Sequence, residues 1–236
     1  MSGGSGSGDV AVIIPAWNEA DRIQATVTAA TGIPGVGLVI AVDDGSKDGT
    51  AAAARHAGAV VIRHARNRGK GAAMETGAAA VALVDQRERR ERPHHLLFLD
   101  ADLGGTAALA GPLVDPVLAG TADMTIAVFA ATVKLGGHGL VVGLSGAGIR
   151  RATGWQPAQP LNGQRCLTRA AFEAARPLAR GWGVETGLSI DLLRKGMRVT
   201  EVEVELAHRA TGTGLRAQLH RAHQLTDVAR ALATRL

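Results

Sequence analysis

Short apolar runs alternate with alanine-rich, helix-like segments along the first half of the chain. Runs of consecutive apolar residues predict strands that are buried on both faces, because such strands have no solvent-facing side. The predicted strands are Val10–Ile14, Leu38–Val42, Val60–Ile62, Leu96–Leu99 and Met124–Val128. The predicted helices between and after them are Asn18–Ala30, Asp48–Ala57, Gly69–Val84 and Thr106–Leu118. This order predicts an α/β fold with a mostly parallel central sheet and helices on both faces.

The second half of the chain is less regular. The stretch "KLGGHGLVVGLSGAG" is rich in glycine and predicts a flexible loop, and "GWQPAQPLNGQR" predicts turns. The alternating "VTEVEVEL" predicts a half-exposed strand. Helices are predicted near Thr168–Ala175 and Val184–Lys195, and an amphipathic one over Leu215–Leu236. The charged run Asp85–Arg92 is interpreted as the solvated end of a helix, with phosphate binding as the alternative.

Length and composition favour one domain. The chain has 236 residues, and its opening "MSGGSGSG" shows no apolar periodicity, so residues 1–8 are expected to be a flexible tail or a cloning remnant. No window approaches the roughly 18 consecutive apolar residues of a membrane span, and no signal peptide is visible. The single cysteine, Cys166, cannot form an internal disulfide, which favours a reducing cytoplasm.

The charge of the chain favours an anionic small-molecule partner. The formal net charge is +5, which suits nucleic acid, anionic lipid or phosphorylated compounds. Binding of single-stranded nucleic acid relies on aromatic stacking platforms, and the chain has only three Trp, three Phe and no Tyr. We therefore expect a phosphorylated substrate and no nucleic-acid partner.

Polar residues follow each of the first four predicted strands. The segments are "PAWNEA" with Asn18 and Glu19, "DDGSKDGT" with Asp43, Asp44 and Ser46, "ARNRGKGAA" with Asn67, Arg68 and Lys70, and "DADL" with Asp100 and Asp102. In open α/β sheets, ligands bind beyond the carboxyl ends of the strands. The four segments together predict one ligand crevice.

The residue types indicate what the crevice binds. Carboxylate and amide oxygens accept hydrogen bonds from a base or a ribose, and Lys70 opens a predicted helix, where phosphate binds well. Asp100 and Asp102 are hard oxygen ligands that suit Mg²⁺ or Mn²⁺ carried in with substrate phosphates. Taken singly, each residue has an ordinary alternative: Asp43 can cap a turn, and Lys70 can be solvated.

The strand-end motifs resemble a known family. "VIIPAWNEADRI", "VDDGSKDGT", "NRGKGAAMETG" and "FLDADL" are similar to the nucleotide-binding half of GT-A glycosyltransferases of family 2, from about Val10 to Val128. The resemblance implies a single GT-A, Rossmann-like domain over residues 9–236, with its nucleotide-binding half at 9–128 and its acceptor-side half at 129–236. It implies a donor site formed by Pro15, Ala16, Asn18, Glu19, Asp44, Ser46, Lys70, Asp100, Ala101 and Gly163.

The carboxyl half resembles a narrower group, glucosyl-3-phosphoglycerate synthase and its relatives. The segments that carry this are "PLNGQR", "GWGVETGLSIDLLRKG" and "VELAHRATG". The resemblance implies that His208 completes a metal site with Asp100 and Asp102. It also implies that Gly163 and Gln164 face the donor sugar, that Glu185 lies near the acceptor, and that the protein forms a dimer.

Two positions depart from that group. This chain has Gln164 where the relatives have glutamate, so a carboxylate near the donor sugar is missing. It reads Gly-His-Gly-Leu at positions 137–140, where the relatives have Gly-Arg-x-Thr for gripping a phosphoglycerate. Lys134, Arg150 and Arg151 are candidate replacements. The acceptor is therefore left open.

The expected activity is metal-dependent transfer of a sugar from a nucleotide diphosphate sugar, with a UDP-sugar favoured, to a hydroxyl acceptor such as a small phosphorylated molecule. Glu185 and Asp191 are candidate bases for an inverting reaction, and a retaining reaction stays open. One alternative is a catalytically inactive nucleotide-sugar-binding protein, because Gln164 replaces the glutamate of the relatives. Another is a haloacid dehalogenase-type phosphatase with Asp100 as nucleophile, although that class leaves the first two motifs unexplained.

Overall fold

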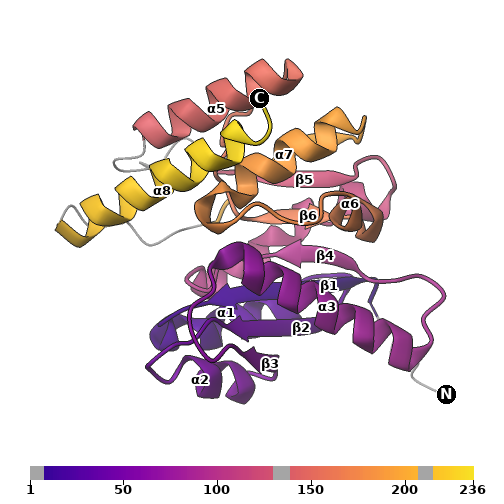
Figure 1. Ribbon diagram of the computed structural model, residues 1–236. Helices are drawn as coiled ribbons and strands as arrows, with labels where there is room; N and C mark the ends of the chain where they lie inside the picture. Colours follow the sequence, from indigo (N-terminus) through magenta and orange to yellow (C-terminus); the bar gives the residue numbers. More distant parts are fainter. Residues whose placement is uncertain (1–7, 130–138, 207–214) are drawn as a thin grey trace.

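The computed structural model describes residues 8–129, 139–206 and 215–236, which form a seven-stranded sheet with helices on both sides (Figure 1). The strands are β1 (Val10–Ala16), β2 (Val36–Asp43), β3 (Val60–Arg63), β4 (His95–Phe98), β5 (Met124–Phe129), β6 (Arg165–Leu167) and β7 (Val199–Val204). Their order across the sheet is β3-β2-β1-β4-β6-β5-β7. All neighbouring strands are parallel except β6, which is antiparallel to β4 and β5. The predicted α/β class with a mostly parallel sheet is confirmed.

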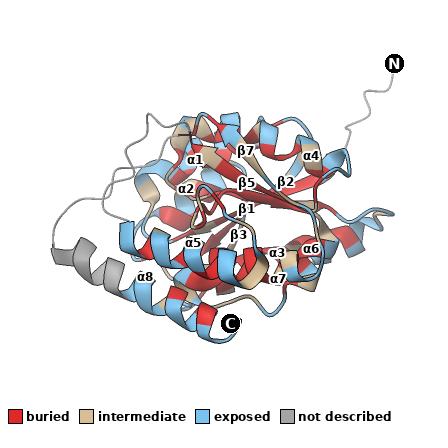
Figure 2. Ribbon diagram, turned by 90° about the horizontal axis from the view of Figure 1, so that it is seen from above, coloured by how far each residue is buried: buried red, intermediate tan, exposed pale blue. Residues whose placement is uncertain are grey.

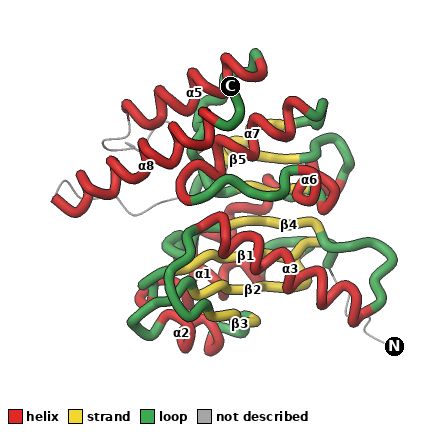
Figure 3. The backbone as a smooth tube through the Cα atoms, in the orientation of Figure 1, coloured by secondary structure: helices red, strands yellow, loops and turns green. Residues whose placement is uncertain are grey.

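The helical elements follow the predicted order closely (Figure 3). They are α1 (Ala20–Thr31), α2 (Thr50–His56), α3 (Lys70–Glu88), the 3₁₀ segment η1 (Gly104–Leu113), α4 (Asp115–Leu118), α5 (Gly139–Thr153), α6 (Arg169–Ala174), the 3₁₀ turn η2 (Gly181–Gly183), α7 (Val184–Arg194) and α8 (Leu215–Ala233). The hydroxyl of Thr168 caps α6 by accepting the backbone N–H of Ala171.

Alternate residues of each central strand pack into opposite layers of the core, as the period-two geometry of a strand requires. Val12 and Ile14 of β1 belong to the cluster under α1 and η1, whereas Ala11 and Ile13 belong to the cluster under α3 and α7. β1 lies mid-sheet and is buried on both faces, as Figure 2 shows. This double burial explains why its sequence is a continuous apolar run.

Helix α7 covers the second core layer, and helices α5 and α8 pack on α7 and on each other (Figure 1). Their shared contact includes Ile149, Ile190, Val228 and Leu232. In the part of the chain that the structure describes, no helix combines the length and the apolar character needed to cross a membrane.

The predicted flexible loop in "KLGGHGLVVGLSGAG" is wrong for residues 139–148, which belong to α5. The buried residues Val141, Ser145, Gly148 and Ile149 recur at helical spacing. A Cβ on Gly148 would come within 2.3 Å of Leu232 in α8. The glycine therefore permits close packing of two helices, and it does not loosen the chain.

Two further elements differ from the predictions. β6 was missed because its three residues lie directly after a turn-rich segment. The predicted helix Thr106–Leu118 is split into the 3₁₀ segment η1 and the short α4. Pro112 and Pro116 lack the backbone N–H that a continuous α-helix needs, which accounts for the split.

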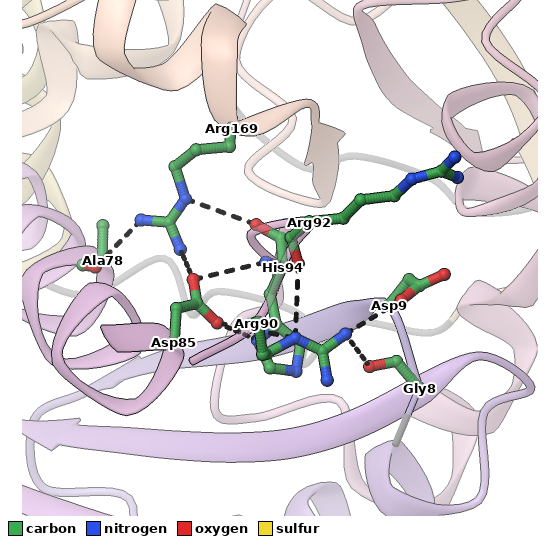
Figure 4. A network of polar contacts seen from close by, with 8 residues as sticks. All are labelled: Gly8, Asp9, Ala78, Asp85, Arg90, Arg92, His94 and Arg169. Carbon is green, nitrogen blue, oxygen red and sulfur yellow. Dashed lines mark hydrogen bonds and ion pairs between the residues drawn. The ribbon is translucent and has the colours of Figure 1, made fainter. Parts of the chain in front are cut away.

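The charged run Asp85–Arg92 is only partly a solvated helix end. The carboxylate of Asp85 is buried and lies against the ring of His94, while the Arg169 guanidinium donates to its Oδ2 at 3.0 Å (Figure 4). Arg90 continues the network to Asp9 at 2.8 Å. Asp85 therefore ties α3 to the starts of β4 and α6, and the prediction of solvent exposure is wrong for this residue.

Candidate active site

The loops after β1 and β2 are joined to each other by hydrogen bonds. The backbone N–H of Asn18 donates to Ser46 Oγ at 2.9 Å, and Asn18 Oδ1 accepts the N–H of Lys47 at 2.9 Å. Asn18 has a φ of 56°, a left-handed conformation that asparagine tolerates better than most residues. This conformation explains why α1 starts at Ala20 and not at the predicted Asn18.

The other residues that the first two motifs predicted for the nucleotide-sugar site lie at the carboxyl ends of β1 and β2. The N–H of Glu19 donates to Thr50 Oγ1 at 2.9 Å, and the N–H of Asp44 donates to the carbonyl of Ala16 at 2.8 Å. Pro15 lies in β1 opposite Val42 of β2. The structure thus brings the predicted positions of the first two motifs together at one edge of the sheet.

The two aspartates after β2 have different surroundings. Asp43 Oδ1 accepts the N–H of Ser46 at 2.8 Å and its Oδ2 lies 3.1 Å from Arg63 Nε, so Asp43 caps the turn. Asp44 is buried, and its carboxylate accepts the N–H groups of Arg68 and Gly69, each at 2.8 Å. Asp44 therefore holds the turn that opens α3.

His64 is a member of this cluster that the sequence analysis missed. Its ring Nδ1 lies 2.6 Å from Asp44 Oδ1, and its Nε2 lies 2.9 Å from Thr76 Oγ1 in α3. The sequence does place His64 directly after β3, and polar residues also follow β1, β2 and β4. That position could have indicated His64 as a site residue. His64 links the Asp44 turn to the body of α3.

Lys70 bridges two carboxylates from opposite halves of the chain. Its Nζ lies 2.7 Å from Asp100 Oδ1 and 2.9 Å from Glu185 Oε1. Burial alone would lower the pKa of Lys70, but the charges and hydrogen bonds of Asp100 and Glu185 outweigh burial and hold the pKa above its ordinary value. The ammonium group therefore stays charged at neutral pH.

Gly163 and Gln164 form the wall beside this ion cluster. A Cβ on Gly163 would lie 2.2 Å from Lys70 Nζ, so any larger residue here requires the ammonium of Lys70 to move. The fully buried Gln164 accepts the N–H of Asp100 at Oε1 and donates from Nε2 to Asp100 Oδ2, both at 3.0 Å. Gln164 thus orients Asp100 through a two-bond pair.

Arg165 is a second residue that the sequence analysis missed. Its buried guanidinium donates to the carbonyls of Asn162, Glu185 and Pro160, and to Ser189 Oγ, at 2.8–3.1 Å. Burial lowers the pKa of Arg165 to about 10, although the charges of Glu185 and Glu201 act in the opposite direction. Arg165 fixes the first turn of α7, and with it the backbone of Glu185.

The turn after β4 is held against α1. Thr26 Oγ1 donates to the carbonyl of Ala101 at 2.8 Å, and Arg22 Nη1 donates to the carbonyl of Asp102 at 2.6 Å. Asp102 is partly exposed. These contacts fix the backbone of the turn that carries Asp102.

The oxygen donors at this edge suit a divalent ion. Mg²⁺ and Mn²⁺ are held by one or two carboxylates together with substrate phosphates. Asp100 and Asp102 supply such carboxylates. Each oxygen of Asp100 also accepts a hydrogen bond within the protein, Oδ1 from Lys70 and Oδ2 from Gln164. Within residues 8–129, 139–206 and 215–236, no group of three or more His, Cys, Asp or Glu side chains is arranged to hold a metal. The predicted ligand His208 lies outside these residues.

Asp191 is not part of the ion cluster around Lys70. Both of its oxygens accept hydrogen bonds from Arg235, at 2.8 and 2.6 Å. Of the two candidate bases, Glu185 is thus the one that contacts Lys70.

The residues considered for acceptor binding are only partly described. Lys134, Gly137 and His138 lie outside the described residues. Arg150 is exposed on α5 and donates to Gln156 at 3.3 Å.

Comparison with known proteins identifies a family pattern over the first half of the chain. A model described as glycosyl transferase family 2 matches residues 11–139. Glycosyltransferase AglJ of Haloferax volcanii is 28% identical over 208 residues, which cover 86% of this chain and 65% of that protein. The uncharacterized protein MJ1222 of Methanocaldococcus jannaschii is 33% identical over 118 residues, which cover 50% of this chain and 45% of that protein. The chain thus spans less than two thirds of the length of both relatives.

Solved structures of glucosyl-3-phosphoglycerate synthase from Mycobacterium tuberculosis share the fold over nearly the whole chain. The complex with Mn²⁺, UDP and phosphoglyceric acid has a TM-score of 0.76 and 25% identity, and covers 97% of this chain and 78% of that one. The complex with phosphoglyceric acid has a TM-score of 0.75 and 26% identity, with coverage of 97% and 80%. The resemblance stated from the motifs is confirmed.

Proposed function

The chain belongs to glycosyl transferase family 2, and on this premise we propose that it transfers a sugar from a nucleotide diphosphate sugar to a hydroxyl group of an acceptor. The observation that carries the proposal is the Lys70 bridge between Asp100 and Glu185. It joins a residue of the matched donor half to a residue of the acceptor-side half. A charged ammonium at the carboxyl end of the sheet suits a diphosphate.

The donor is proposed to be a UDP-sugar. Support comes from the similarity to a synthase solved with Mn²⁺ and UDP, at 25% identity over 97% of this chain. The nucleoside would lie over the joined loops of Asn18, Glu19, Asp44 and Ser46. Asp44 already holds the Lys70 turn through two backbone N–H groups, so it would act on the donor mainly by shaping that turn.

Asp102, with Asp100 and the proposed ligand His208, would hold Mg²⁺ or Mn²⁺. The ion would supply positive charge to the diphosphate as it leaves. Lys70 would stabilise the same negative charge from a fixed position, because Asp100 and Glu185 orient its ammonium before the donor arrives.

Glu185 is proposed as the base that accepts the proton of the acceptor hydroxyl. Its carboxylate is buried beside Lys70, and its backbone is fixed by Arg165. An inverting reaction needs such a carboxylate within hydrogen-bond reach of the hydroxyl. Proton NMR of the first-formed product anomer tests this role, because retention of configuration would contradict an inverting base.

The acceptor is proposed to be a small phosphorylated molecule other than the one used by the synthase group. The solved neighbours hold phosphoglyceric acid. This chain lacks the arginine and threonine of the Gly-Arg-x-Thr pattern at positions 137–140, so its acceptor contacts must come from other residues. The family match leaves no support for the phosphatase alternative, whereas an inactive nucleotide-sugar binder remains an outcome of the tests.

A thermal-unfolding screen of nucleotides and nucleotide sugars, with and without divalent metal, tests the donor assignment. A ligand that binds the folded state raises the unfolding midpoint. UDP and UDP-sugars are expected to raise it only when Mn²⁺ or Mg²⁺ is present. Absence of any metal-dependent shift with UDP or GDP compounds would contradict the proposal. Binding without turnover across an acceptor panel would identify an inactive binder.

A further inference from the structure

A cavity of about 570 Å³ lies between the segment before η2 and helix α8. Its volume is within the range typical of small-molecule sites. Pro177, Leu178, Ala179 and Ala231 form an apolar wall. The remaining lining residues are polar: Arg180, Asp227, Arg230, Thr234 and Arg235.

The polar side of this cavity carries more positive than negative charge. The lining residues include three arginines, Arg180, Arg230 and Arg235, and one acidic residue, Asp227. Arg235 is engaged with Asp191, and Arg230 lies 3.6 Å from Asp227 with its side chain 77% exposed. Arg180 is exposed, and its guanidinium has no hydrogen-bond or ion-pair partner among the described residues. The guanidinium of Arg180 is therefore free for an anion, and that of Arg230 is held only by a long, exposed ion pair with Asp227.

The cavity is separated from Lys70 by one stretch of backbone. On one side, the segment Ala179–Gly183 packs against the start of α3: a Cβ on Gly71 would lie 2.7 Å from the carbonyl of Ala179. On the other side, Asp227 Oδ2 accepts the N–H of Trp182 at 3.2 Å. A ligand that bridges the segment and α8 would stabilise the backbone on which the Lys70 turn packs.

We propose that this cavity is a second binding site, distinct from the donor site, which takes a phosphate-bearing small molecule. Arginine is the side chain best suited to phosphate, because its planar guanidinium donates two parallel hydrogen bonds. The apolar side chains of Pro177 and Leu178 suit the apolar part of such a molecule. Binding at this cavity does not require that the chain transfers a sugar.

Isothermal titration with inorganic phosphate, against chloride at equal ionic strength, tests the site without any nucleotide. The wild-type chain is expected to bind phosphate, and the Arg180→Gln/Arg230→Gln variant is expected to bind at least about tenfold more weakly. Both arginines are on the surface, so an unchanged unfolding midpoint in chloride checks that the variant is folded. Arg55→Gln, an exposed arginine on α2, is the matched control and should bind like the wild type.

The Lys70→Met variant separates this site from the donor site. Phosphate binding that survives Lys70→Met and is lost in the double arginine variant supports the proposal. Binding that is lost in Lys70→Met and kept in the double arginine variant places phosphate at the donor site and overturns it. Absence of phosphate binding by the wild type also overturns it. None of these outcomes depends on whether the chain transfers a sugar.

Discussion

Gly163 lies so close to Lys70 that a Cβ on residue 163 would come within 2.2 Å of Lys70 Nζ and 3.2 Å of Asp100 Oδ1. The backbone of Gly163 thus packs directly against Lys70 and Asp100, two of the three residues of the ion cluster. A side chain at this position must displace the ammonium of Lys70, because Lys70 Nζ is the atom nearest to the added Cβ.

Gly163→Ala is therefore expected to impair the site through Lys70. Overpacking of this kind costs about 1–3 kcal/mol in unfolding free energy, and a misplaced Lys70 should lower transfer at least about tenfold. The measurements are chemical unfolding and kcat/KM. Gly143→Ala in α5 is the control, since a Cβ there meets nothing within 4 Å. Equal effects of the two substitutions would contradict the view that close packing of Gly163 against Lys70 matters for the site.

Glu185 and Asp191 lie on the same helix but are expected to respond differently to neutralisation. Glu185→Gln removes the proposed base, so kcat should fall by about 10²- to 10⁴-fold. Asp191→Asn weakens the two-bond pair with Arg235, so its main effect should be on stability, by about 1–3 kcal/mol. Steady-state kinetics and unfolding measured on both variants separate the two roles. If Asp191→Asn lowered kcat more than Glu185→Gln, the assignment of the base would be wrong.

Asp85 is expected to be a major determinant of stability although it begins a charged run. Asp85→Ala leaves His94 and Arg169 without their shared buried carboxylate (Figure 4). Breaking a buried ion pair from one side costs about 3–5 kcal/mol. Glu88→Ala, exposed on the same helix, should change the unfolding free energy by less than about 0.5 kcal/mol. Urea unfolding of the two variants provides the comparison, and similar midpoints would contradict a structural role for Asp85.

Cys166 is expected to be unreactive in the folded chain. It is fully buried in β6, and burial raises the pKa of its thiol far above its usual range, despite an opposing backbone hydrogen bond from Leu167. A higher pKa leaves less thiolate at any given pH, and the thiolate is the reactive form. Alkylation at about pH 8 should therefore be at least tenfold slower in the native chain than in guanidinium chloride. Equal rates would indicate that β6 opens readily.

The first half of the fold was predictable because its signals are local. Continuous apolar runs mark β1 and β2, and the polar residues that follow them must meet at the carboxyl edge of a parallel sheet. The α5 helix could also be predicted from the sequence, since Val141, Ser145 and Ile149 recur at helical spacing. The glycines of this stretch conceal that periodicity, because glycine is typical of loops. Gly148 serves contact with Leu232, which only the packed structure reveals.

The pairing across the site could not be predicted from the sequence. Glu185 reaches Lys70 because the antiparallel β6 and the buried guanidinium of Arg165 set the position of α7. A three-residue strand and a buried arginine both run against ordinary sequence preferences. The bond between the Gln164 side-chain amide and Asp100 also joins residues far apart in the sequence, and no local pattern predicts it.

The most direct test of the proposed activity is release of UDP from UDP-sugars by the purified chain in the presence of Mn²⁺, with EDTA and the Asp100→Asn variant in parallel. A metal-dependent glycosyltransferase should release UDP with Mn²⁺ present, more rapidly when a suitable hydroxyl acceptor is added. Release should stop in EDTA and fall by about 10²-fold or more in Asp100→Asn. No release from any UDP- or GDP-sugar, or release that is the same with EDTA and in Asp100→Asn, would contradict the proposed function.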